Sequence, residues 1–126
     1  MDATENVLNI VKKVYPDEYD IVGKSTTYNI IKKVLKKEDI ELVYSDKGSD
    51  LDLSESINLL FGLVQVIAAI IQIIEYRKNK KESIKKEDIL TDLRESFPRE
   101  TDVDIPIEDY DKIISEILSN DGQVEQ

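Results

Sequence analysis

The feature that most constrains this chain is a run of 19 residues, 56–74, without a single charged side chain. The run is followed by Glu75 and then by a basic segment, 77–81, which suits the negative end of a helix macrodipole. No other segment of the chain is as apolar or as long. The sequence therefore predicts one long apolar helix over residues 55–78.

One narrow arc of this helix differs from the rest of its circumference. At about 100° per residue, an arc of about 80° holds only amides, small residues and one tyrosine. These six residues, called the seam below, are Asn58, Gly62, Gln65, Ala69, Gln72 and Tyr76. The rest of the circumference carries twelve large apolar side chains. Leaving half of them in water would forfeit roughly 10 kcal/mol at about 1.5–3 kcal/mol each, so this helix needs a cover.

Three covers are compatible with the sequence. The protein's own shorter helices can surround the long helix and leave the seam in water, a structural arrangement that implies no function. Another protein or a second copy can pack on the seam, since the spacings Asn58–Gln65–Gln72 and Gly62–Ala69–Tyr76 are those of a left-handed helix pair. A membrane is the third cover. Insertion would gain about 4–7 kcal/mol from the apolar residues, and each buried amide would return about 1–3 kcal/mol.

The remaining segments predict a mainly helical fold with a small β contribution. Apolar residues at helical spacing predict a helix over 4–15 ended by Pro16, a polar turn over 17–20, and a helix capped by Ser25 or Thr26 that runs to Lys37. A β-hairpin is expected over 40–53, and an acidic pair of helices over 84–119. Together with the long helix at the centre, these elements amount to about five helices and a short hairpin. We expect a single domain over 1–120, with an N-terminal part over 1–79 and a disordered tail over 121–126.

The charge of −10 is concentrated at one end of the chain. Residues 1–86 hold 14 acidic and 14 basic side chains, whereas residues 87–126 hold 13 acidic and 3 basic ones. Such a surface repels phosphate backbones, so we expect no direct nucleic-acid binding. The densest acidic patch is Asp102, Asp104, Glu108, Asp109 and Asp111. It is typical of a solvated surface, of an inhibitor that mimics nucleic acid, or of a segment that pairs with the basic run 77–86 of its own chain or of a neighbouring copy.

Composition and motifs both argue against an enzyme. The chain has neither cysteine nor histidine, which excludes disulfides and removes the commonest general base and transition-metal ligand. Gly23-Lys24-Ser25-Thr26 resembles the end of a phosphate-binding loop, but Glu18 stands where that pattern needs glycine. The acids from Asp46 onward fail the calcium-loop pattern, because Leu51 takes the glycine position. We expect no catalytic residue, no cofactor and no metal.

These observations predict a non-enzymatic interaction or adaptor module that acts through the long helix, with self-association as one route. Two alternatives stay open: a membrane-associated or single-span protein with a cytoplasmic C-terminus, and a small acidic inhibitor that mimics nucleic acid through its C-terminal third. The N-terminal residues lack the basic start and the apolar stretch of a secretory signal. A cytoplasmic location is therefore expected, with membrane association as its alternative.

Overall fold

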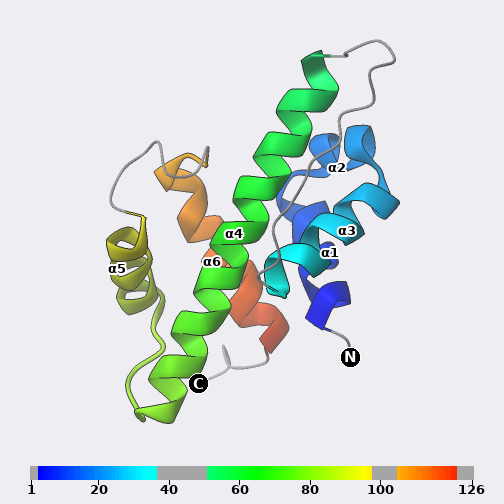
Figure 1. Cartoon of the computed structure of the whole chain (residues 1–126). Coiled ribbons are helices and arrows are strands. Elements are labelled where there is room, and N and C mark those ends of the chain that lie inside the picture. The colour runs from blue at the N-terminus through cyan, green and yellow to red at the C-terminus, as the bar shows by residue number, and fades with distance from the viewer. Residues whose placement is uncertain (1–2, 37–50, 98–104, 122–126) are drawn as a thin grey trace. The chain divides into compact units, whose positions relative to one another are not determined.

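The computed structural model describes residues 3–36, 51–97 and 105–121, which form six helices (Figure 1). They are α1 (Ala3–Val14), α2 (Pro16–Val22), α3 (Lys24–Leu35), α4 (Leu51–Asn79), α5 (Lys86–Ser96) and α6 (Ile107–Asp121). No strand occurs within these three ranges. The expectation of a mainly helical chain with one long apolar helix is confirmed.

The predicted β-hairpin over 40–53 is not supported. Residues 40–50 lie outside the described residues, and 51–53 form the first turn of α4. The alternation of Leu51 and Leu53 with acids suggested a strand. Acidic side chains are also favourable at a helix start, where they face the positive end of the macrodipole. The long helix thus begins four residues earlier than predicted and ends at Asn79, one residue later.

The chain divides into two compact units, Met1–Val64 and Gln65–Gln126, called unit 1 and unit 2 below. Their boundary falls inside α4, so that residues 51–64 belong to unit 1 and residues 65–79 to unit 2. The single domain over 1–120 stays a prediction. The predicted tail over 121–126 starts one residue too early, because Asp121 ends α6, and 122–126 lie outside the described residues.

Unit 1 contains three short helices that contact one another pairwise, α1, α2 and α3. The face predicted for α1 is buried, and it consists of Val7, Ile10, Val11 and Val14. From α3 the residues Thr27, Ile30 and Ile31 are buried, while Tyr28, Val34 and Leu35 are half-buried. Its lysines are exposed, apart from Lys33, which is half-buried. The 3.6-residue periodicity therefore identified the packed faces of both helices correctly.

The polar turn predicted over 17–20 is wrong, because these residues belong to α2. Pro16 occupies the first turn of α2, where its missing N–H leaves no hydrogen bond unmade. Asp17 and Glu18 follow in the same turn, where the helix dipole favours acids. Pro16 thus separates two helices instead of beginning a loop, and α2 is the additional helix that raises the number from five to six.

The predicted cap of α3 is also wrong. The helix begins at Lys24 with Gly23 as its N-cap, and no side chain caps it. Ser25 and Thr26 are exposed in the first turn. The Thr27 hydroxyl donates a hydrogen bond of 2.8 Å to the Gly23 carbonyl oxygen instead. Gly23 closes α2 as well, since its N–H donates to the carbonyl oxygen of Tyr19 at 2.8 Å.

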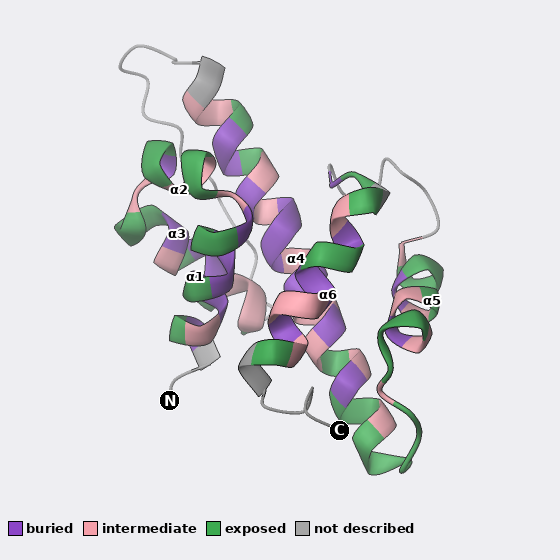
Figure 2. Ribbon diagram, turned by 180° about the vertical axis from the view of Figure 1, so that it is seen from behind, coloured by how far each residue is buried: buried purple, intermediate pink, exposed green. Residues whose placement is uncertain are grey.

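Unit 2 contains the second half of α4 together with α5 and α6, and α5 contacts α6. The buried residues of these helices lie along one face of each (Figure 2). In α5 they are Ile89 and Leu93, with Leu90 and Phe97 half-buried. In α6 they are Tyr110, Ile113, Ile114 and Ile117, with Leu118 half-buried. These are the faces that the apolar spacing predicts.

Candidate interaction site

The seam is not uniformly exposed. In unit 1, Asn58 is exposed and Gly62 is buried. In unit 2, Gln65 and Ala69 are half-buried, whereas Gln72 and Tyr76 are exposed. Tyr76, at 59% exposure, is one of two large hydrophobic residues that are exposed in the described part of the chain. The exposed residues of the seam are therefore Asn58 at its N-terminal end and Gln72 and Tyr76 at its C-terminal end.

The twelve large apolar residues of α4 are covered to different degrees. Eight are buried, namely Ile57, Leu60, Leu63, Val64, Val66, Ile67, Ile70 and Ile74. The other four, Leu59, Phe61, Ile71 and Ile73, are only half-buried. Most of the apolar circumference is therefore already out of water, and Phe61 and Ile73 are the two half-buried members that border the seam.

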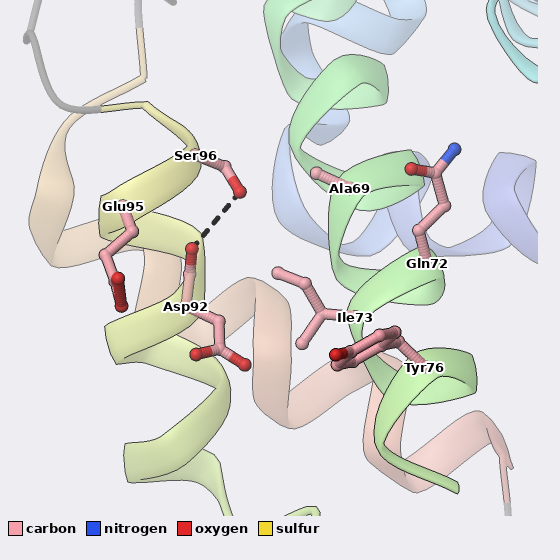
Figure 3. Close-up of a pocket in the computed structure, with 7 residues that line it drawn as sticks. All are labelled: Ala69, Gln72, Ile73, Tyr76, Asp92, Glu95 and Ser96. Carbon is pink, nitrogen blue, oxygen red and sulfur yellow. Dashed lines mark hydrogen bonds between the residues drawn. The ribbon is translucent and has the colours of Figure 1, made fainter. Parts of the chain in front are cut away.

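An open groove of 520 Å³ lies in unit 2 between α4 and α5 (Figure 3). It is lined by Ala69, Gln72, Ile73 and Tyr76 of α4 and by Asp92, Glu95 and Ser96 of α5. Ile73 points into the space between the two helices, while Gln72 and Glu95 point away from it. The structure thus brings three seam residues together with a wall from α5 that helical spacing could not identify.

The turn after α4 has the hydrogen bonds of a Schellman motif. The Glu82 N–H donates to the Arg77 carbonyl oxygen at 2.8 Å, and the Lys81 N–H donates to that of Lys78 at 3.1 Å. Lys81 adopts a positive φ of 57°, a position that glycine usually fills. This motif could not be predicted, because a lysine stands where a glycine would mark it. The turn reverses the chain and starts the path to α5.

Arg77 holds α5 against the end of α4. Its Nε donates to Asp92 Oδ2 at 2.7 Å, and its Nη1 donates to the Ser83 carbonyl oxygen at 2.9 Å. Glu82 adds a weaker ion pair, with Oε1 3.8 Å from Nη1. The hydrogen bond that Arg77 donates to the Asp92 carboxylate raises the pKa of Arg77, against an opposing effect of burial. Arg77 therefore stays charged at every pH at which the folded protein is handled, and this side of the pair does not titrate.

Replacing Arg77 should loosen α5. We expect Arg77→Ala to lower the free energy of unfolding of unit 2 by about 1–2 kcal/mol, between the values for exposed pairs and for hydrogen bonds to charged groups. Arg77→Lys keeps the charge but loses the planar set of donors, so it should retain only part of the stability that Arg77 contributes. Urea denaturation would measure both. Lys112→Ala is a matched control, because it removes one exposed positive charge of unit 2. An equal loss in the control would show that the bond to Asp92 contributes nothing specific.

The acidic patch is only partly within the described residues. Asp102 and Asp104 lie outside them, Glu108 is exposed, and Asp109 is half-buried. Asp111 Oδ1 forms an exposed ion pair of 3.3 Å with Lys86 Nζ. Lys86 of the basic run 77–86 thus pairs with Asp111 of the patch, whereas Arg77 pairs with Asp92, which lies outside the patch.

Two further features of the described residues concern metal binding and membranes. No group of three or more carboxylates there could hold a metal ion. One helical segment, residues 53–79 of α4, is long and apolar enough to cross a membrane, and its most apolar 18 residues have a mean hydropathy of 2.3. Half of its most apolar 18 residues are buried. A buried core helix of a soluble protein passes the same test, so this is weak support for the membrane alternative.

The chain shows no significant match in any of three comparisons: no family model, no curated protein and no solved structure matches it.

Proposed function

We propose that this chain is a non-enzymatic module that binds another protein through the C-terminal part of the seam. The observation that carries the proposal is the groove between α4 and α5, because three of the six seam residues line it. The exposed Tyr76 offers the large amphipathic surface that is enriched at protein interfaces. The exposed Gln72 offers an amide that can both donate and accept hydrogen bonds.

The burial of the rest of α4 supports the same site. Protein-binding grooves combine an apolar floor with polar groups at the rim. Ile73 is the half-buried aliphatic residue of this groove, and Asp92 and Ser96 are its polar neighbours on α5. The Ser96 hydroxyl donates to the Asp92 carbonyl oxygen at 3.1 Å, and it keeps a lone pair for a donor from a partner (Figure 3).

Site-specific photocrosslinking in the native host tests this proposal. A photoreactive phenylalanine analogue at position 76 is expected to give a crosslinked product, because Tyr76 is exposed and lines the groove. The same analogue at position 9 is the matched control, since Asn9 is also exposed on a helix but lies in unit 1. Equal yields at both positions, or none at either, would contradict the proposal. The mass of the product distinguishes a second copy from a different protein.

Membrane association is the second candidate, and the hydropathy of α4 is the observation that favours it. If α4 spans a bilayer, the protein should stay with the membrane fraction after carbonate extraction and need detergent for release. Recovery in the soluble fraction would leave protein binding as the better interpretation. The exposed polar residues of α4 in unit 2, Gln72 and Glu75 among them, add to the cost of insertion.

A further inference from the structure

We propose that the turn between α4 and α5 binds an anionic lipid surface. The turn carries the basic run 77–86, which holds six basic side chains and one acidic one in a chain of net charge −10. The proposal goes beyond the protein-binding function, and it does not require α4 to enter a bilayer. Three observations support it: the exposure of the lysines, the position of the turn, and the residues that precede it on α4.

The lysines of the run are in contact with water. All five are exposed, namely Lys78, Lys80, Lys81, Lys85 and Lys86. Lys86 Nζ is paired with Asp111 at 3.3 Å. Lys81 and Lys85 form no ion pair within the described residues. Their charges are therefore available to the phosphate groups of a lipid surface.

The turn lies at one tip of unit 2. Figure 1 and Figure 2 view the chain from opposite sides, and in both the end of α4 and the loop after it lie below α5 and α6. A flat surface can therefore touch this tip while much of the two acidic helices stays further away. Salt limits the reach of a charge to about 8 Å at physiological ionic strength, so the charges nearest the surface dominate the contact.

The end of α4 has the composition of a membrane interface. Tyr76 is 59% exposed, and the Nζ atom of Lys80 lies 5.6 Å from the centroid of its ring. Tyrosine collects at the headgroup level of membranes, because its ring is apolar and its hydroxyl group is polar. Clusters of about four to eight lysines and arginines that follow an apolar helix are typical of segments that bind anionic lipids. This combination favours a lipid surface over an acidic protein.

The contact leaves the fold as it is. In unit 2 the apolar residues Val66, Ile67, Ile70 and Ile74 of α4 are already buried. Moving them into lipid would gain little, because the hydrophobic gain depends on apolar surface that is removed from water. The attraction must therefore come mainly from the charges of the run, and it should weaken as salt is added.

Vesicle sedimentation with the full-length protein tests this proposal. The probe is a vesicle of phosphatidylcholine with about one third phosphatidylserine, and the control is a vesicle of phosphatidylcholine alone. We expect binding to the first vesicle, with an affinity that falls as salt rises, and no binding to the second. Carbonate extraction should release the bound protein, because it contacts only the surface.

Two double variants locate the contact. Lys80→Gln with Lys81→Gln removes two charges of the run. Because each lysine near an anionic surface contributes about a factor of five, this variant should bind about 25-fold more weakly. Its urea midpoint should equal that of the unchanged protein, since both side chains are exposed.

The matched control is Lys32→Gln with Lys36→Gln on α3 of unit 1. It changes the net charge equally at two exposed positions, and Lys32 also packs on a tyrosine ring, that of Tyr28 at 5.6 Å. Because these lysines lie outside the run, the loss should be less than about threefold.

Fluorescence gives a second measurement that does not depend on the lysine variants. The chain has no tryptophan, so Tyr76→Trp introduces a single one next to the run. Its emission should shift to the blue when phosphatidylserine vesicles are added, because the indole leaves water. Asn9→Trp, at an exposed position of unit 1, should show no shift.

Four results would overturn the proposal. They are equal binding to both vesicles, equal losses in the two double variants, equal shifts at positions 76 and 9, and bound protein that resists carbonate, which would indicate an inserted α4. Absence of vesicle binding together with a crosslink to an acidic protein at position 76 would overturn the lipid contact and leave the proposed function standing. Vesicle binding without any crosslink would do the reverse.

Discussion

Leu93→Ala is expected to lower the free energy of unfolding of unit 2 by about 2–5 kcal/mol. Leu93 is fully buried in α5, the helix that forms one wall of the groove. The substitution removes three carbon atoms and leaves a cavity that the neighbouring side chains fill only in part. A helix as short as α5, with 11 residues, is marginal without its packed face. The groove should therefore be lost together with the helix.

Leu90→Ala is the matched control for this prediction. It makes the same chemical change on the same helix, but Leu90 is only half-buried, so the loss should be clearly smaller. Urea denaturation measures both, and hydrogen exchange assigns the loss to residues. A single cooperative domain over 1–120 predicts that the amides of α1 and α3 lose protection as well. Loss confined to unit 2 would show that the two units unfold separately.

Gly23→Ala is expected to destabilise unit 1 by about 1–3 kcal/mol. The backbone of Gly23 has φ 91° and ψ 156°, a conformation open almost only to glycine. Apart from Gly23 and its two chain neighbours, no heavy atom of the described residues lies within 4 Å of the position that an alanine Cβ would take. The whole cost should therefore come from the backbone dihedral angles, and it should appear as a lower urea midpoint with an unchanged m-value.

Ser25→Ala tests whether a side chain in the first turn of α3 stabilises the same turn. A capping role for Ser25 would make its loss cost about 1 kcal/mol. The side chain of Ser25 is exposed and does not cap α3, so we expect a change below about 0.5 kcal/mol. If Ser25→Ala proves as costly as Gly23→Ala, the turn has a different conformation in solution.

The amphipathic faces could be predicted because they depend on local spacing. A helix that buries one side repeats apolar residues every three or four positions, and α1, α5 and α6 follow this rule. The uncharged run likewise indicated α4. The segments whose structure was predicted wrongly are those in which local signals compete. A proline such as Pro16 is compatible both with a loop after a helix and with the first turn of a new helix. The packing of α2 against α1 and α3 favours the second alternative.

The candidate site was predictable in part for the same reason. A spacing of about 100° per residue placed Ala69, Gln72 and Tyr76 on one face of α4, and these residues do line one groove. It could not show that Gly62 of the same arc is buried. Helical spacing could not show either that Asp92 and Ser96 line the same groove as Tyr76. Their position depends on the turn in which Lys81 has a positive φ and on the hydrogen bond from Arg77 to the Ser83 carbonyl oxygen. Neither feature leaves a periodic signal in the sequence.

The position of the boundary between the units has a practical consequence for anyone who wishes to truncate this protein. Domain boundaries ordinarily lie in exposed linkers, whereas this one lies between Val64 and Gln65 in mid-helix. A cut there would leave four carbonyl groups on one fragment and four N–H groups on the other without their helical partners. Each fragment would also carry a freshly bared end of a very apolar helix. Shortened versions should therefore retain the whole of α4, and aggregation is the expected fate of those that do not.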